Sequence, residues 1–245
     1  AQINPVVGDI EFNQKIMIDV IENKQSTHDV IIFPELSLTG YPPEDLLLRK
    51  EFQQHVDESL QVIQAATKGC HTIVGHPTIE NSHCFNSLSV FHNGQRVHLY
   101  HKQHLPNYGI FDEERYFKAG SKNPCLFDIK NQRVGVCICE DLWSPGPAED
   151  LINLGASILI SINASPFDYD KYYRREEVLK QHAQKGVTII YVNQVGGQDE
   201  LLFDGLSLAI DKEGTLCARS PAFEEHLATV SINSLWKRLA VSNYQ

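Results

Sequence analysis

Three segments of the sequence place a reactive side chain directly after an apolar stretch that is typical of a β-strand. Phe33-Pro34-Glu35 places a carboxylate there, His101-Lys102 an amine, and Cys139-Glu140-Asp141 a thiol followed by two acids. A thiol needs a base to become a nucleophile, and the oxyanion formed in acyl transfer needs a fixed positive charge. The carboxyl ends of strands tend to converge on one crevice in α/β folds, so the three groups together predict a nucleophilic acyl-transfer site.

Each of these side chains also has an ordinary explanation. Buried cysteine is usually a small hydrophobic residue, so Cys139 can be part of the core. Glu35 can cap the loop after its strand, and Lys102 can be a solvated or salt-bridged surface residue. The chemical interpretation therefore depends on the thiol, the carboxylate and the amine meeting in space.

The elements that would position them follow from hydrophobic periodicity. Six short apolar segments rich in β-branched residues predict strands at 29–33, 71–75, 87–91, 133–139, 157–162 and 187–192. Helical patterns lie between them. The buried faces of the first two helices are predicted to carry Phe12, Ile16 and Val20, and Phe52, Val56, Leu60 and Ile63. This alternation of strands and helices predicts an α/β fold.

Two hairpin patterns interrupt the alternation and predict mixed sheets. Residues 87–91 turn through Asn93-Gly94 into 96–101, and residues 205–210 turn through 212–214. Gly196-Gly197 is interpreted as a further turn. No repeat, low-complexity tract or linker divides residues 1–245, which are expected to form one domain. Residues 236–245 have no evident partner and are expected to form an exposed tail or a contact arm.

Composition excludes several classes of function. With 21 Lys and Arg against 31 Asp and Glu, the net charge of −10 argues against nucleic-acid binding. No apolar run approaches the roughly 20 residues of a membrane span. The six cysteines form no CxxC pair or dense framework, and no secretory pattern opens the chain, so a reducing, cytoplasmic location is expected. Residues 1–5 suggest the end of a strand entering a turn, with a few native residues expected before them.

Two cysteine or histidine patterns suggest metal sites as alternatives. Cys137 and Cys139 could bind a soft metal, but two thiolates need further ligands and no second pair is spaced to provide them. His98, His101 and His104 recur every third residue, whereas alternation along a strand places His101 opposite its neighbours. Packed or solvated histidines are the simpler interpretation, and no metal is expected.

Longer blocks around the three reactive residues resemble a known family. Residues 33–48, 102–113 and 136–143 resemble the three signature blocks of the nitrilase (carbon–nitrogen hydrolase) superfamily, in the same order. Within it, residues 40–45 and 193–205 resemble the glutaminase domains of glutamine-dependent NAD⁺ synthetases. The resemblance covers nearly the whole chain and is far more specific than a single short motif. It implies a four-layer α-β-β-α sandwich with mixed sheets.

The resemblance also implies roles for individual residues. Glu35 matches the general base, Lys102 the essential lysine and Cys139 the nucleophile, each unaltered in its block. Glu113 matches a second glutamate that orients the lysine or the substrate. The alternative for Glu113 is a solvated acidic turn, because Asp112 and Glu114 flank it.

Glutamine is the substrate that the resemblance implies. Its charged α-groups need polar partners once they leave water, and Tyr108, Ser165 and Lys171 match the residues that supply them. The implied reaction is attack of the Cys139 thiolate on the side-chain amide, with the oxyanion held by Lys102 and the backbone N–H of Glu140. Ammonia leaves first, and water then releases glutamate from the thioester.

Partners are implied in the same way. In glutamine-dependent NAD⁺ synthetases the ammonia passes to a second part that adenylates and amidates a nicotinic-acid dinucleotide. This chain contains neither a Ser-Gly-Gly-x-Asp-Ser loop nor a Gly-x₄-Gly-Lys-Ser/Thr loop, so no cofactor is expected for it. ATP and Mg are expected only at a synthetase domain outside the chain. Superfamily members commonly pair, which implies a homo-oligomer. A free-standing amidase for another ω-amide or carbamoyl compound and a catalytically idle assembly domain remain alternatives.

Overall fold

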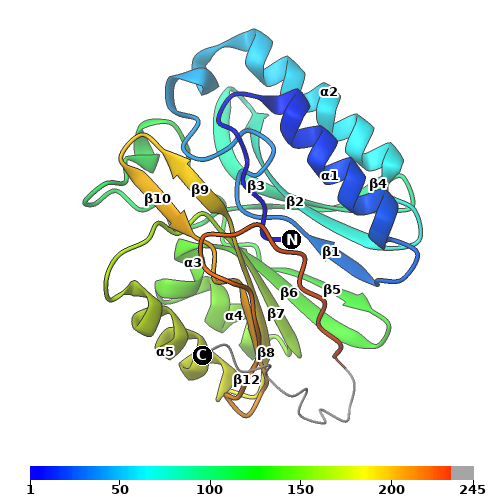
Figure 1. The fold of residues 1–245 in the computed structure, drawn as a ribbon, viewed down its shortest axis with the longest axis vertical. Helices are drawn as coiled ribbons and strands as arrows, with labels where there is room; N and C mark the ends of the chain where they lie inside the picture. The colour runs from blue at the N-terminus through cyan, green and yellow to red at the C-terminus, as the bar shows by residue number, and fades with distance from the viewer. Residues whose placement is uncertain (233–245) are drawn as a thin grey trace.

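Two β-sheets lie face to face between two layers of helices (Figure 1). The computed structural model describes residues 1–232, so the expectation for residues 236–245 lies outside it. The first sheet has the order β1-β2-β3-β4 and the second the order β12-β11-β8-β7-β6-β5. The four-layer α-β-β-α sandwich with mixed sheets that the sequence predicted is confirmed.

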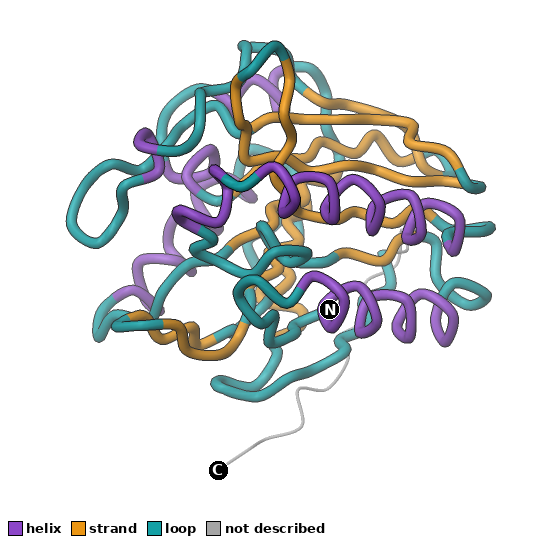
Figure 2. The backbone as a smooth tube through the Cα atoms, turned by 90° about the horizontal axis from the view of Figure 1, so that it is seen from above, coloured by secondary structure: helices purple, strands orange, loops and turns teal. Residues whose placement is uncertain are grey.

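The first sheet combines one parallel pair with two antiparallel pairs. β1 runs parallel to β2, whereas β2–β3 and β3–β4 are antiparallel hairpins. Two long helices cover its outer face side by side (Figure 2). The elements are α1 (Ile10–Lys24), β1 (Val30–Ile32), α2 (Lys50–Ala66), β2 (His71–Glu80), β3 (His83–His92) and β4 (Gln95–His101), with a 3₁₀ turn, η1, at Glu44–Leu48.

The second sheet has a parallel centre and antiparallel edges. β6, β7 and β8 are parallel, and β5, β11 and β12 add to them in antiparallel orientation. Helices α4 and α5 cover its outer face, and the short α3 follows β6 directly. The elements are η2 (Glu113–Arg115), β5 (Cys125–Ile129), β6 (Gln132–Ile138), α3 (Glu140–Trp143), α4 (Pro147–Asn153), β7 (Ile158–Asn163), α5 (Lys171–Ala183), β8 (Thr188–Asn193), β11 (Leu208–Ile210) and β12 (Leu216–Arg219).

An apolar cluster of buried side chains joins the two sheets. Val90 and Tyr100 from the first sheet pack with Val136, Ile138 and Ile160 from the second. Fully burying one such aliphatic side chain contributes about 1.5–3 kcal/mol, so this layer fixes the spacing between the sheets. The ends of β4 and β6 are thereby brought to the same region.

The helix faces show where periodicity succeeded and where it failed. α2 buries Phe52, Val56, Leu60 and Ile63 as predicted. In α1 the prediction for Phe12 was wrong, because that side chain is 44% exposed. The buried face includes Asn13 instead, whose amide bonds the backbone of Val6 and Leu38 and so sets the rotation of the helix.

Several predicted strand boundaries are also wrong. Gly196-Gly197 is not a turn but part of β9 (Val195–Gln198), which pairs with β10 (Leu201–Asp204). β5 was not predicted. In residues 1–5, only Gln2 makes a β-bridge, to His226. The strand predicted to include Cys139 ends one residue earlier, at Ile138.

No helix within residues 1–232 has the length and apolar character needed to cross a membrane.

Candidate active site

Cys139 occupies a sharp turn between β6 and α3. Its backbone has φ 44° and ψ −97°, a left-handed conformation that costs a non-glycine residue on the order of 1–3 kcal/mol. The turn is held by its N–H, which donates to Ile162 O over 2.9 Å. Because the chain leaves the strand here, Cys139 joins the core between the sheets while Cys137 packs on the helix side. The two thiols therefore do not form a pair, and 8% of Cys139 remains accessible.

Glu35 follows β1 and is completely buried. Its Oε1 accepts hydrogen bonds from Asn86 Nδ2 at 2.7 Å and from Lys102 Nζ at 2.6 Å. Its Oε2 accepts one from the Ala164 backbone N–H at 2.8 Å. The donors come from β3, from the end of β4 and from the end of β7, so the carboxylate is fixed by both sheets.

Lys102 follows β4 and its ammonium is held by two carboxylates. Besides Glu35, Nζ donates to Glu113 Oε1 at 2.8 Å and Oε2 at 3.0 Å. Burial alone lowers the pKa of Lys102, but the charges of Glu113 and Glu35 outweigh burial and raise the pKa well above its usual value. Lys102 is therefore a fixed cation at neutral pH.

Glu113 begins the 3₁₀ turn η2 and is only 5% exposed. The Tyr41 hydroxyl donates to its Oε1 at 2.9 Å. Burial raises the pKa of Glu113 to about 7, assisted by the charge of Glu35 and opposed by Lys102. The flanking Asp112 and Glu114 are exposed, so the solvated-turn interpretation applies to them and not to Glu113.

The Cys139 thiol lies within electrostatic reach of this cluster. Burial, followed by the charge of Glu35, raises the pKa of Cys139 well above its usual value, while Lys102 and Lys171 oppose the shift. The resting group is therefore a neutral thiol within electrostatic reach of the Glu35 carboxylate, which is the candidate base. A nucleophile, a base and a fixed cation are the components of amide hydrolysis through a covalent intermediate.

The other predicted residues surround the thiol with differing exposure. Tyr108 is 59% exposed, and its hydroxyl donates to Glu140 Oε2 at 3.0 Å. The Glu140 N–H is the first of α3 and has no acceptor within the helix. Lys171 begins α5, and its ammonium lies 5.5 Å from the centre of the Phe111 ring. Burial lowers the pKa of Lys171.

Ser165 differs from these residues because it is almost fully buried. Arg175 Nη2 lies 3.4 Å from its hydroxyl, and the same guanidinium pairs with Asp204 at 3.1 Å. Asn193 accepts the Ser165 N–H through Oδ1 at 2.8 Å. The structure thus connects Ser165 to an interior polar network, and it brings Glu35, Lys102, Glu113 and Cys139 together.

Sequence reasoning missed the residues that support this cluster. Asn86 and Tyr41 bond the two glutamates, and Arg175 with Asp204 lies behind Ser165. A signal existed for Asn86, a polar residue directly before the predicted strand 87–91. Arg175 had none, because nothing in the local sequence separates it from the exposed Arg174.

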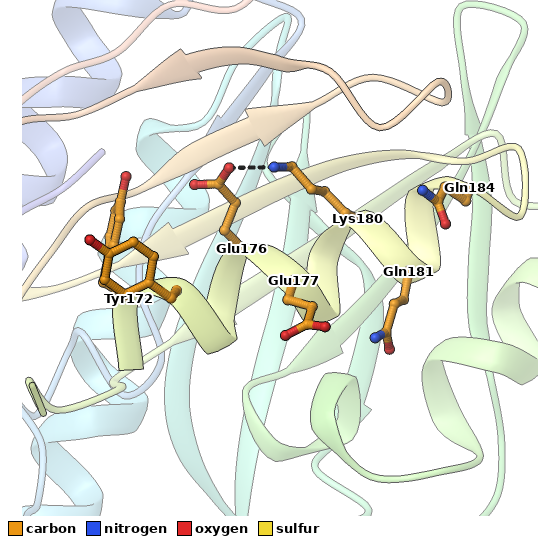
Figure 3. A pocket seen from close by; sticks show the side chains of 7 residues that line it. Tyr172, Glu176, Glu177, Lys180, Gln181 and Gln184 are labelled. Atoms are coloured by element: carbon orange, nitrogen blue, oxygen red, sulfur yellow. Dashed lines mark hydrogen bonds and ion pairs between the residues drawn. The ribbon is translucent and has the colours of Figure 1, made fainter. Parts of the chain in front are cut away.

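No metal centre accompanies the cluster in the part of the chain that the structure describes. There, no group of three or more His, Cys, Asp and Glu side chains is arranged to hold an ion. His98 stacks on Phe127, and His101 bonds the Ser87 hydroxyl at 2.7 Å. A hollow of about 580 Å³ along the outer face of α5 is lined by polar side chains, among them the paired Glu176 and Lys180 (Figure 3). It includes none of the predicted site residues.

The chain is similar in sequence to glutamine-dependent NAD(+) synthetases. A glutamine-dependent NAD(+) synthetase of Aquifex aeolicus is 42% identical over 237 residues, covering 95% of this chain and 41% of the relative. One from Thermotoga maritima is 39% identical over 240 residues, with 95% and 41% covered. This chain therefore spans less than half the length of these relatives.

Solved structures show the same fold. The glutamine-dependent NAD+ synthetase from Acinetobacter baumannii superposes with a TM-score of 0.88 at 37% identity, over 92% of this chain and 43% of that one. An amidase from Nesterenkonia sp. superposes with a TM-score of 0.81 at 21% identity, over 92% and 85%. Residues 1–240 match the carbon–nitrogen hydrolase family. With that match over nearly its whole length, the chain belongs to the carbon–nitrogen hydrolase family.

Proposed function

We propose that this chain hydrolyses the side-chain amide of glutamine to glutamate and ammonia through a thioester on Cys139. The observation that carries the proposal is the buried contact between Lys102 and Glu35 beside the Cys139 thiol. The choice of glutamine is supported by relatives named glutamine-dependent NAD(+) synthetases.

In the first step Glu35 takes the proton of the Cys139 thiol as sulfur attacks the amide carbon. Oε1 of Glu35 already accepts two hydrogen bonds and Oε2 accepts one, so Oε2 has the freer lone pair for this proton. A carbon–sulfur bond forms and the carbonyl oxygen becomes an oxyanion. The Lys102 ammonium and the Glu140 N–H stabilise that charge.

In the second step the carbon–nitrogen bond breaks and Glu35 returns the proton to the leaving nitrogen. Ammonia departs, and the γ-glutamyl group remains as a thioester on Cys139. Glu35 then removes a proton from water, which attacks the thioester carbon. The carbon–sulfur bond breaks, glutamate is released, and Glu35 returns the proton to the Cys139 sulfur. Glu113 keeps the Lys102 ammonium in place during both steps through its two hydrogen bonds.

The α-groups of glutamine require partners outside the buried cluster. Lys171 supplies a cation for the α-carboxylate, and Tyr108 supplies a hydroxyl at the exposed side of the site. Glu140, whose carboxylate bonds Tyr108, offers a negative charge for the α-ammonium. Ser165 contributes through the backbone and hydroxyl that Asn193 and Arg175 fix.

The proposed destination of the ammonia is a synthetase domain, for which the relatives leave room because this chain covers only 41% of the Aquifex aeolicus synthetase. ATP and Mg would act at that domain and not at this site. We also propose that the protein assembles as a homo-oligomer and works in the cytoplasm.

The test measures glutamate release by the full-length protein and by its Cys139→Ala variant. The variant should lose turnover almost completely, whereas Cys217→Ala, which removes a half-buried thiol on β12, should retain it. A diazoketone analogue of glutamine should modify Cys139, as located by mass spectrometry. Undiminished release by Cys139→Ala would refute the mechanism. Faster turnover of another ω-amide than of glutamine would refute the substrate.

A further inference from the structure

Asp141, in the short helix α3, is a buried acid for which the proposed mechanism has no use. Its side chain is completely buried. Oδ1 accepts the backbone N–H of Gln103 at 3.0 Å and that of His104 at 2.9 Å. Oδ2 accepts the Tyr100 hydroxyl at 2.8 Å and the Ile138 N–H at 3.2 Å. Both oxygens are thus fully engaged.

The four donors come from only two places in the chain. Tyr100, Gln103 and His104 flank Lys102, and Ile138 immediately precedes Cys139. Lys102 follows β4 of the first sheet, whereas Cys139 follows β6 of the second. No ladder of backbone hydrogen bonds joins β4 to β6, because they belong to different sheets. The Asp141 carboxylate is a polar connection between the two strand ends.

A buried carboxylate without an ion-pair contact is costly to fold, and the charge of Lys102 acts on Asp141 only from beyond contact distance. Within residues 1–232, no Lys, Arg or His side chain lies within ion-pair distance of Asp141. Burial raises the pKa of Asp141, and the hydrogen bonds from His104 and Tyr100 oppose that shift. Its contacts serve to hold backbone, since three of the four donors are peptide N–H groups.

We propose that Asp141 is a positioning residue that fixes the Lys102 segment against the Cys139 turn, so that the ammonium faces the oxyanion formed on the attacked carbonyl. This inference rests on the proposed amide hydrolysis. Hydrogen bonds from Glu35 and Glu113 orient the end of the Lys102 side chain, while Asp141 sets where its backbone lies relative to sulfur. The effect of losing Asp141 is therefore expected in the chemical step and not in glutamine binding.

The first test is Asp141→Asn in the full-length protein. The asparagine amide keeps the shape of the Asp141 side chain and can still accept hydrogen bonds at its one oxygen. Its NH₂ group, however, is a donor that faces another donor, either Ile138 N–H or the N–H groups of Gln103 and His104. We expect kcat to fall by roughly 10²-fold, as for a misplacement of about 1 Å, with the KM for glutamine changed less than about threefold. Asp128→Asn, an exposed acid on β5, is the matched control and should change neither constant.

The second test asks whether Asp141 acts through Lys102. Lys102→Met should lower kcat by roughly 10²–10³-fold, and adding Asp141→Asn should then lower it little further. Losses that multiply in the double variant would overturn the inference, because Asp141 would then act independently of the ammonium. So would a normal kcat in Asp141→Asn, or a loss confined to KM.

Tyr100→Phe covers the case in which Asp141→Asn does not fold. It removes one donor and keeps the carboxylate with its three backbone bonds, so kcat should fall by about threefold to tenfold with KM unchanged. An unchanged kcat would contradict the inference. Wild-type and Cys139→Ala proteins are assayed alongside. If the wild type releases no glutamate, the proposed function is contradicted. If the wild type releases glutamate and the Asp141 and Tyr100 variants keep the wild-type kcat, only this inference is contradicted.

Discussion

Lys102 Nζ donates to Glu35 Oε1 over 2.6 Å although the two residues follow opposite edge strands of the first sheet. Glu35 follows β1 and Lys102 follows β4, so the Glu35 segment must reach across the ends of β2 and β3. It lies against Gly75 of β2, and Asn86 of β3 bonds the same carboxylate oxygen. The base and the cation meet because the middle strands leave room for this crossing and support it.

Gly75 lies under the Glu35 segment where it crosses β2, and there is no room for a side chain at this position. A Cβ there would overlap Pro34 O, Leu36 N and Glu35 Cα. Gly75→Ala should therefore displace Glu35 and lower kcat for glutamine hydrolysis by roughly 10²-fold. Gly197→Ala, whose Cβ would meet Leu202 at an ordinary 3.4 Å, serves as the control and should remain close to wild type. Steady-state kinetics of both variants checks the prediction, which fails if Gly75→Ala has wild-type kcat.

Glu113→Gln should weaken the hold on Lys102 while keeping the shape of the side chain. Loss of a charged hydrogen-bond partner costs about 1.5–3 kcal/mol, which corresponds to a decrease of roughly 10–10²-fold in kcat. Glu114→Gln changes the exposed neighbour and should leave kcat intact. Equal effects of the two substitutions would contradict the assignment of Glu113.

The same carboxylate predicts a pH dependence. Because the pKa of Glu113 is raised to about 7, the group gains a proton as pH falls through 7 and loses the charge that holds Lys102. Wild-type kcat should decrease on the acid side of pH 7, and this limb should flatten in Glu113→Gln. Kinetics between pH 5 and 9 measures both profiles; an unchanged acid limb in the variant would assign it to another group.

Cys139 should react slowly with alkylating agents in the absence of substrate. Burial and the charge of Glu35 raise the pKa of its thiol well above the usual value, so the thiolate forms only at a higher pH than for an ordinary cysteine. Modification by iodoacetamide at pH 7 should be slower than that of free glutathione and should increase steadily into the alkaline range. A rate that is already maximal at neutral pH would indicate a preformed thiolate and contradict proton transfer to Glu35 during attack.

Arg175 and Arg174 are neighbours whose loss is expected to lower stability by very different amounts. Arg175 pairs with Asp204 where both side chains are buried, whereas the Arg174–Asp168 pair is exposed. Arg175→Met leaves a buried charge and should lower the free energy of unfolding by about 3–5 kcal/mol. Arg174→Met should cost at most about 1 kcal/mol.

Urea unfolding of the two variants measures this difference. Adding Asp204→Leu to Arg175→Met removes the unpaired charge and should restore part of the lost stability. Similar midpoints for the two single variants would mean that the buried pair contributes little.

Features that depend on residues close together in the chain could be predicted from the sequence. The faces of α2 and the positions of the buried strands follow from side-chain periodicity, which depends on residues two to four positions apart. Within α1 the prediction held for Val20 but failed for Phe12, because the backbone of Val6 and Leu38 draws Asn13 inward and Leu38 lies far outside the helix. The 133–139 strand was one residue too long because a left-handed residue at Cys139 leaves no mark in hydrophobicity.

The sequence by itself determined which reactive groups this protein has and that each follows a strand. Residue types and local spacing placed a carboxylate, an amine and a thiol at Glu35, Lys102 and Cys139. Only the tertiary structure decided that Glu113 is buried against Lys102, that Asp141 joins the two sheets, and that the crossing over Gly75 brings base and cation together. The physical reason is that these contacts join residues distant in the chain, and their energies depend on strand order and sheet packing that no local pattern encodes.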